Sequence, residues 1–232
     1  MGERSIDRLP RGGPRASCLD RLLETDRQEY VDRDYGRWFG DHQRFAYLVL
    51  DEIADVPDPH VLHLGAGRGE LSSALLEMHP TAHVTVADGD AESVAAMAAG
   101  PLGSDPRVTV RTMDATDVDA ADGTFDLAVL ALALHRLPPA LAARVIAEGT
   151  RVADRLVLID LPRPPAPLHL LRLATMAPFV PFLPVVHDGL VSSLRTYSPS
   201  ALRALAAYAD PAIEIDVRVG LLGPQVAVAS RP

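Results

Sequence analysis

The stretch VLHLGAGRGEL, residues 61–71, decides the fold of this chain. A short apolar run ends in glycines at alternate positions, Gly65, Gly67 and Gly69, and a helix-compatible sequence follows. Glycine permits positive φ angles and lacks the Cβ atom that would hold a ligand away from the main chain. A strand, a glycine turn and a helix in this order predict a loop on which a flat or elongated ligand lies, beside the first N–H groups of the helix. Glycine turns also occur for purely structural reasons, so the motif alone leaves both interpretations open.

Around the glycine loop, short apolar runs alternate with segments of helical spacing. The runs predict five strands, at His60–Leu64, His83–Ala87, Arg107–Arg111, Phe125–Leu130 and Arg155–Asp160. Helical stretches lie between most of them, near Glu70–Met78, Ala91–Ala99 and Pro139–Thr150. This alternation is typical of an α/β fold in which helices cover both faces of a parallel sheet. Ligands of such sheets bind outside the carboxyl ends of the strands, which makes the glycine loop the first candidate site.

The residues before this core predict two further parts. Residues 1–16 are polar and rich in Arg, Gly and Pro, and they predict a disordered tail. Residues 17–56 predict an N-terminal helical lid, with one helix over 41–54. The main domain is expected to occupy residues 57–232.

A cap is expected to interrupt the main domain at about residues 162–194. Seven of the chain's twenty prolines lie between Pro162 and Pro184, so no long helix can run through this segment. We expect one helix within it, around His169–Met176. After the cap, the pattern predicts a helix and a hairpin that complete a mostly parallel sheet of seven strands, at Pro199–Ala209, Ile213–Arg218 and Val226–Ser230.

The composition disfavours several classes of protein. The net charge of −9 argues against nucleic acid as the main partner, because phosphate binding needs clustered basic residues. Cys18 is the only cysteine, so no disulfide framework and no cysteine-based metal site can form within one chain. A reducing compartment, the cytoplasm, is the natural location. No apolar run is long and uninterrupted enough to predict a membrane span, and no metal is expected.

The residues after the glycines narrow the choice of ligand. A dinucleotide fingerprint would read GxGxxG, whereas here the third glycine comes one residue early and Glu70 stands in its place. A carboxylate there would repel a pyrophosphate, which disfavours a nicotinamide or flavin dinucleotide. Asp88 closes the second predicted strand and can accept hydrogen bonds from both hydroxyls of a ribose. It could instead cap the following helix, but Asp90 can fill that position equally well.

Four stretches together carry a family resemblance: VLHLGAGRGEL, VTVADGD (84–90), RVTVRTMDATDV (107–118) and GTFDLAVLALALHRLP (123–138). They resemble, in residues, order and spacing, the motifs of class I S-adenosylmethionine-dependent methyltransferases, over about residues 57–161. The stretch HDGLVSSLRTYSPSALRALA (187–206) resembles, more loosely, the C-terminal half of small bacterial methyltransferases found beside polyketide and other secondary-metabolite genes. The resemblance implies a Rossmann-like fold and S-adenosylmethionine as cofactor.

Carried over to this sequence, the resemblance implies a set of cofactor-binding positions. They surround the methionine part (Gly65, Ala66, Gly67 and Gly69), the ribose (Asp88, with Gly89 beside it) and the adenine (Met113, Asp114 and Ala115). Two of these residues also fit other roles, since Met113 could be a buried loop residue and Asp114 a turn residue. His63 departs from the family, which usually carries an acid there that helps to hold the methionine amino group.

On the substrate side, two histidines are candidates for a catalytic base. His135 follows the fourth strand on the same edge of the sheet as the glycine loop, although a histidine here is usually structural in the family. His187, next to Asp188, is the second candidate. Trp38, Arg195 and Tyr197 are expected to contact the substrate or to anchor the lid and cap. The apolar side chains of the cap fit a greasy or aromatic substrate or the interface of a homodimer, and the sequence leaves both open.

These features predict an enzyme that transfers a methyl group from S-adenosylmethionine to an oxygen or carbon of a small apolar or aromatic metabolite, such as a polyketide. Methyl transfer needs alignment, exclusion of water and, for a protonated nucleophile, a base. One alternative keeps the cofactor pocket but catalyses a cyclisation or an elimination, which the histidine at position 63 leaves open. Another is a non-catalytic scaffold that binds the cofactor.

Overall fold

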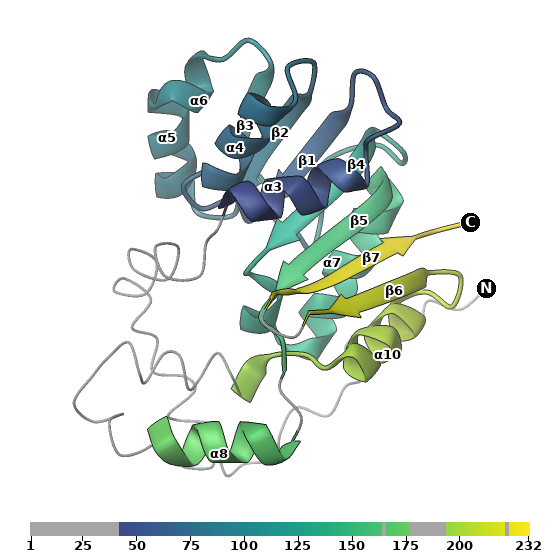
Figure 1. Ribbon diagram of the computed structural model, residues 1–232. Helices are drawn as coiled ribbons and strands as arrows, with labels where there is room; N and C mark the ends of the chain where they lie inside the picture. Colours follow the sequence, from purple (N-terminus) through teal and green to yellow (C-terminus); the bar gives the residue numbers. More distant parts are fainter. Residues whose placement is uncertain (1–41, 164–165, 177–193, 221–222) are drawn as a thin grey trace. The chain divides into compact units, whose positions relative to one another are not determined.

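The computed structural model describes residues 42–163, 166–176, 194–220 and 223–232. The chain divides into two compact units, and each is described by itself. One unit comprises residues 41–164 and 195–232, and the other comprises residues 1–40 and 165–194. The first unit is built around a seven-stranded sheet with the strand order β3-β2-β1-β4-β5-β7-β6 (Figure 1).

The strands follow the predicted pattern closely. They are β1 (His60–Leu64), β2 (His83–Asp88), β3 (Val108–Thr112), β4 (Phe125–Ala131), β5 (Ala153–Asp160), β6 (Glu214–Val219) and β7 (Gln225–Ser230). The strands β1 to β5 are parallel to one another, while β7 runs antiparallel to both β5 and β6. The predicted α/β class and the mostly parallel seven-stranded sheet are therefore confirmed. The strand order reverses beside β1, so β1 and β4 both present their carboxyl ends at the crevice where ligands of such sheets bind.

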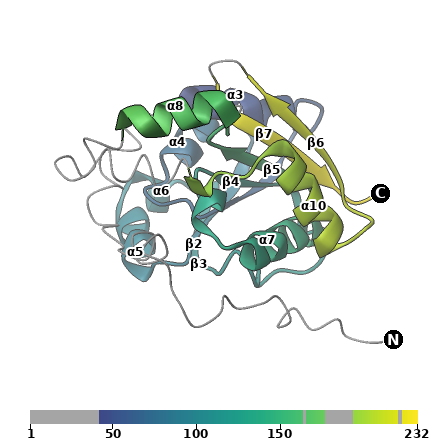
Figure 2. The same ribbon diagram turned by 90° about the horizontal axis from the view of Figure 1, so that it is seen from below.

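Helices cover both faces of this sheet. The first face is packed by α3 (His42–Asp51), α4 (Glu70–Met78), α5 (Ala91–Ala99) and α6 (Pro101–Ser104). The second is packed by α7 (Pro139–Val152) and α10 (Pro199–Ala209). Seen from below, α3 and α4 lie on one side of the strands and α7 lies on the other (Figure 2). This layering is the one expected for a sheet that must bury both faces.

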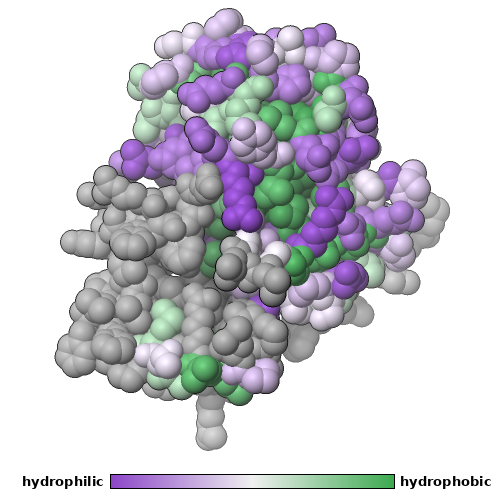
Figure 3. Space-filling model, in the orientation of Figure 1, coloured by the Kyte–Doolittle hydropathy of each residue, from purple (hydrophilic) through white to green (hydrophobic). Residues whose placement is uncertain are grey.

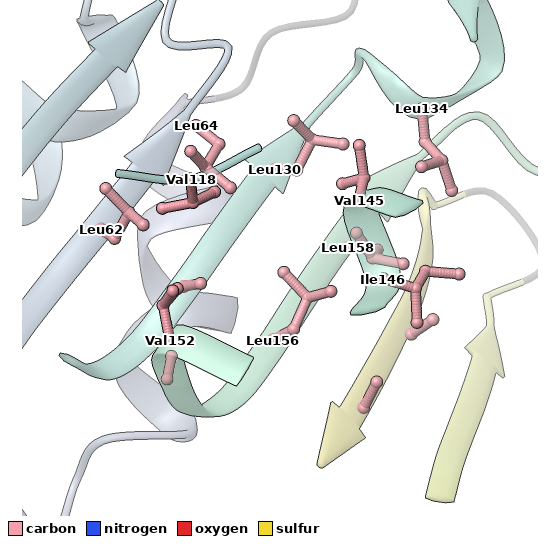
Figure 4. Close-up of a cluster of buried hydrophobic side chains, with 14 of the residues drawn as sticks. Leu62, Leu64, Val118, Leu130, Leu134, Val145, Ile146, Val152, Leu156 and Leu158 are labelled. Carbon is pink, nitrogen blue, oxygen red and sulfur yellow. The ribbon is translucent and has the colours of Figure 1, made fainter. Parts of the chain in front are cut away.

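The alternation of side chains along β1 explains why both layers are needed. Leu62 and Leu64 point into one core with α7 and α10, while Val61 points into the other with α3 and α4. In the first core, the leucines of β1, β4 and β5 meet Val145 and Ile146 of α7 (Figure 4). Each such side chain, once buried, contributes about 1.5–3 kcal/mol to folding. Figure 3 shows that hydrophilic side chains border an apolar area on the face drawn towards the viewer.

Two short elements were not predicted from the sequence. They are α6 and a 3₁₀ helix, η2 (Leu134–Arg136). With four and three residues, they are too short for a periodic pattern to develop. The predicted cap helix is present as α8 (Ala166–Met176), which begins three residues earlier than expected and belongs to the second unit. The tail, most of the lid and the hairpin turn fall on residues 1–41 and 221–222, outside the described residues.

Candidate active site

The three glycines of the loop after β1 all adopt left-handed backbone conformations, but for different reasons. Their φ angles are 58° at Gly65, 56° at Gly67 and 75° at Gly69. A Cβ atom at Gly69 would overlap the side chain of Leu102, and one at Gly65 would lie 3.3 Å from Leu130 Cδ1. A Cβ atom at Gly67 would meet nothing within 4 Å. Two of the glycines are therefore needed for packing within the protein, and Gly67 alone faces open space that a ligand could fill.

We expect Gly69→Ala to lower the free energy of unfolding by about 2–4 kcal/mol. Positive φ strains an alanine by about 1–2 kcal/mol, and overpacking of a core adds about 1–3 kcal/mol. Gly123→Ala is the matched control, because Gly123 has a φ of 62° and open space around its Cβ position. Gly123→Ala should lower the free energy of unfolding only by the ~1–2 kcal/mol that a positive φ costs an alanine. Urea unfolding of both variants measures the difference, and equal losses would contradict the packing role of Gly69.

Asp88 ties the end of β2 to the glycine loop. The Gly67 N–H donates to Asp88 Oδ2 at 2.7 Å, and the Asp90 N–H donates to Asp88 Oδ1 at 2.9 Å. Asp90 caps α5, because its side chain accepts hydrogen bonds from the N–H groups of Glu92 and Ser93. Of the two residues that the sequence allowed for this cap, Asp90 therefore fills it, and Asp88 is not used as a helix cap. Its carboxylate lies instead beside the one glycine that faces open space, with Gly89 next to it in the chain.

The residues after β3 lie next to Asp88. The Met113 N–H donates to the Asp88 carbonyl at 2.9 Å, and the Met113 side chain is 5% exposed within the core. Asp114 Oδ1 accepts hydrogen bonds from the N–H and hydroxyl of Thr116, both at 2.8 Å. The structure thus shows the turn that the sequence allowed for Asp114, and it uses only one of the two carboxylate oxygens. Ala115 packs, partly buried, against the same core.

His63, where the family usually has an acid, is buried in β1 and hydrogen-bonded. Its Nδ1 lies 2.7 Å from Ser72 Oγ of α4, and the side chain is 3% exposed. Burial, with a smaller effect from the nearby His42, lowers the pKa of His63 from 6.5 to about 4. The imidazole is therefore neutral at pH 7 and supplies no charge to the glycine loop.

The low pKa of His63 predicts that the protein loses stability in mild acid. Since the pKa is about 4 when folded and 6.5 when unfolded, the unfolded chain takes up the proton first as the pH falls. The stabilisation is fully present above pH 6.5 and is lost between pH 6.5 and 4, amounting to about 2 kcal/mol by pH 5. His63→Asn can keep a hydrogen bond to Ser72 but does not titrate, so its unfolding free energy should fall less over this range. Parallel pH curves for parent and variant would refute this assignment.

His135 forms a buried pair with an acid at the end of β5. His135 Nδ1 lies 2.6 Å from Asp160 Oδ1, and the His135 N–H donates to Asp160 Oδ2 at 2.8 Å. The Leu161 N–H also donates to Oδ1, at 2.8 Å. The exposed fractions are 3% for His135 and 7% for Asp160. A histidine whose Nδ1 is held by a carboxylate presents its other ring nitrogen in a fixed direction, as general-base catalysis requires.

The segment that carries His135 begins at a strained residue. Leu132 has a φ of 55°, the only positive value at a non-glycine position among the described residues. Its N–H donates to the Ile159 carbonyl of β5 at 2.7 Å. A branched residue in this conformation is costly and persists only when its surroundings impose it. Here the strain turns the chain from β4 into η2 and brings His135 to Asp160.

Tyr197, which lies just before α10, contacts the segment that follows His135. Its hydroxyl donates to the Leu137 carbonyl at 2.6 Å, and its own carbonyl accepts from Gln225 Nε2 at 3.1 Å. Burial, together with the negative charge of Asp160, raises the pKa of Tyr197 to about 12. The phenol therefore stays protonated and acts as a donor. Tyr197 anchors the chain near His135, which is one of the two roles that the sequence left open.

Of the three remaining predicted site residues, the structure describes only Arg195. Arg195 is half-buried and interacts with other parts of the chain. Trp38 and His187 lie outside the described residues. Asp160, the partner of His135, was not predicted from the sequence. The signal was available, because an acid ends the run LVLID in the strand next to the one that His135 follows.

The described part of the chain offers no group of three or more His, Cys, Asp or Glu side chains arranged to hold a metal ion. None of its helices is long and apolar enough to span a membrane. The candidate site thus consists of the glycine loop, the acid closing β2, the loop after β3 and the His135–Asp160 pair.

Comparison with known proteins gives a consistent result. The sequence model described as "Methyltransferase domain" matches residues 61–155. A ribosomal RNA small subunit methyltransferase C of Pseudomonas putida is 33% identical over 95 residues, which cover 40% of this chain and 29% of that protein. A demethylmenaquinone methyltransferase of Clavibacter sepedonicus is 28% identical over 130 residues, covering 56% and 52%. The chain thus spans about half or less of the length of these curated relatives.

Among solved structures, the magnesium protoporphyrin IX methyltransferase of Synechocystis, crystallised with S-adenosylhomocysteine, aligns with a TM-score of 0.58. It is 19% identical, and the alignment covers 95% of this chain and 90% of that one. The strand order, the glycine loop after β1 and the acid closing β2 define an α/β protein with the class I methyltransferase fold. Residues 61–155 match the methyltransferase domain family, and the predicted resemblance to class I S-adenosylmethionine-dependent methyltransferases agrees with this match and with the fold.

Proposed function

We propose that this chain transfers a methyl group from S-adenosylmethionine to an oxygen or carbon atom of a small apolar or aromatic metabolite. The observation that carries the proposal is the contact between Gly67 and Asp88, which sets a carboxylate beside main chain that faces open space. A ligand with a ribose and a chain that lies flat on the loop fits this arrangement. When bound, the cofactor supplies a methyl group on a positively charged sulfur.

In this proposal, Asp88 accepts hydrogen bonds from the ribose hydroxyls. The loop Gly65–Gly69 contacts the methionine part through the main chain. The adenine lies by Met113, Asp114 and Ala115, where one oxygen of Asp114 is not used by its turn. These assignments rest on the family resemblance and on the proximity of the β1, β2 and β3 loops at one edge of the sheet.

His135 is the proposed base that removes the proton of the accepting group. It follows β4 at the same edge of the sheet as the glycine loop, because β1 and β4 are parallel neighbours. Asp160 holds Nδ1 and so fixes the direction of the other ring nitrogen. A phenol or an enolisable carbon fits a base of this kind better than a nucleophile that arrives unprotonated.

Charge and an exposed apolar surface support the proposed class of substrate. The net charge of −9 disfavours an RNA backbone, although two curated relatives are named for ribosomal RNA. In the second unit, Leu170 and Leu171 of α8 are 66% and 61% exposed, which fits an apolar substrate or an apolar partner such as a second copy. A cytoplasmic location is proposed only from the single cysteine.

Two measurements test the proposal. Calorimetry should show that the protein binds S-adenosylhomocysteine. Mass spectrometry of metabolite extracts incubated with cofactor labelled in the methyl group should show a product that has gained one labelled methyl. Binding without any labelled product in small-molecule, RNA or protein fractions would support the cyclisation, elimination or scaffold alternatives. Absence of binding would refute the cofactor assignment itself.

A further inference from the structure

Three side chains with hydrogen-bonding or charged groups lie together where α4 begins, beside the glycine loop. Glu70 is the first residue of α4 and follows Gly69 directly. Its Oε2 lies 2.8 Å from Nε2 of His42, the first residue of α3. His42 in turn is close enough to His63 to affect its charge. One carboxylate and two imidazoles thus border the end of the loop at which β1 passes into α4.

His63 cannot provide a negative charge at this place. Its ring is buried and neutral, and Nδ1 is taken by Ser72. The main-chain groups of the loop and the first turn of α4 are donors with a partial positive charge. Such surroundings attract the carboxylate of an amino acid and offer its ammonium group no charged acceptor. A carboxylate of the protein beside the loop would supply that charged acceptor, and Asp88 is already assigned to the ribose.

Glu70 is placed to be that carboxylate. Its side chain is 47% exposed, so a ligand on the loop can reach it. The contact with His42 is made through Oε2 of Glu70, so Oε1 can accept from a ligand. The contact with His42 also limits the directions in which the Glu70 side chain can point, which reduces the entropy lost when a ligand binds.

We propose that Glu70 binds the ammonium group of the methionine end of the cofactor, at a loop where position 63 carries no charge. His42 acts as a positioning residue that holds the Glu70 carboxylate towards the loop. This inference rests on the proposed function, since it needs a cofactor with an amino-acid end. It assigns a role to the residue whose carboxylate the sequence analysis used only to disfavour a dinucleotide.

Calorimetry with two probes tests the proposal on the full chain. S-adenosylhomocysteine carries the amino-acid end, and 5′-methylthioadenosine keeps the nucleoside but lacks it. Glu70→Gln should bind S-adenosylhomocysteine about 5–20-fold more weakly, as expected for one partly exposed charge-assisted hydrogen bond, and should bind 5′-methylthioadenosine as the parent does. Glu77→Gln is the matched control, because it removes an exposed carboxylate from the same helix further from the loop. It should leave both affinities unchanged.

The possible outcomes separate this inference from the proposed function. If the parent does not bind S-adenosylhomocysteine, the proposed function fails. If the parent binds and Glu70→Gln binds S-adenosylhomocysteine equally well, only the role of Glu70 is wrong. Equal weakening of both probes would also overturn it, because Glu70 would then act on the shape of the loop. His42→Ala should reproduce part of the selective loss, and a loss shared with 5′-methylthioadenosine would contradict its positioning role.

Discussion

Replacing His135 with alanine is expected to lower the rate of methyl transfer by about 10²–10⁴-fold, which is the usual contribution of a positioned general base. The acceptor would be the one found by the labelling experiment. Asp160→Asn should give a smaller loss, because the amide keeps most of the shape of the carboxylate that orients His135, and His135 itself is retained. Both variants should bind S-adenosylhomocysteine like the parent, since neither residue touches the glycine loop or Asp88.

Two controls make this result specific. His83→Ala removes an exposed histidine at the amino end of β2, on the opposite edge of the sheet, and should leave the rate unchanged. Unfolding curves are needed as well, because Asp160 accepts three N–H groups and its loss leaves buried donors unpaired. A folded His135→Ala variant that methylates at the parental rate would show that the histidine is structural, as it usually is in the family.

The second large effect concerns the cofactor. Asp88→Ala should weaken binding of S-adenosylhomocysteine by about 10²–10⁴-fold, because two hydrogen bonds from ribose hydroxyls to a carboxylate are each worth about 1.5–3 kcal/mol. The change also frees the Gly67 N–H, whose bond to Asp88 fixes the loop. Calorimetry with the purified variant measures the effect directly.

Asp90→Ala is the matched control for Asp88. Both carboxylates lie in the same turn between β2 and α5, but Asp90 serves only as the cap of α5. Its loss should cost about 1 kcal/mol of stability and leave the affinity within a few-fold of the parent, since the main-chain N–H that binds Asp88 is kept. If the two variants bound equally well, the ribose assignment would be wrong.

The helices and strands could be predicted from the sequence because apolar residues recur along each of them with the spacing typical of its type. The predicted bounds of β1, α4, α5 and α10 agree with the structure, and the other strands differ by at most two residues at either end. Apolar runs bounded by glycine, proline or aspartate mark a buried strand within a few residues of chain. The order of strands and helices then left few sheet topologies to consider.

What could not be predicted depends on contacts between distant residues. The packing role of Gly69 comes from Leu102, which lies in a helix too short to be recognised. The charge state of His63 depends on its complete burial, and the pairing of His135 depends on Asp160 in the neighbouring strand. Sequence spacing shows which residues share an edge of the sheet. It does not show which of them come within hydrogen-bond distance.

The strained backbone at Leu132 has a consequence for laboratory evolution. A glycine or asparagine tolerates that conformation better than leucine does, so selection for heat resistance alone would find a ready gain of about 1 kcal/mol there. The same substitution would loosen the turn three residues before His135. A screen that measures only melting temperature would thus enrich for variants with higher thermal stability and a lower rate of methyl transfer. The rate therefore needs to be measured in the same screen.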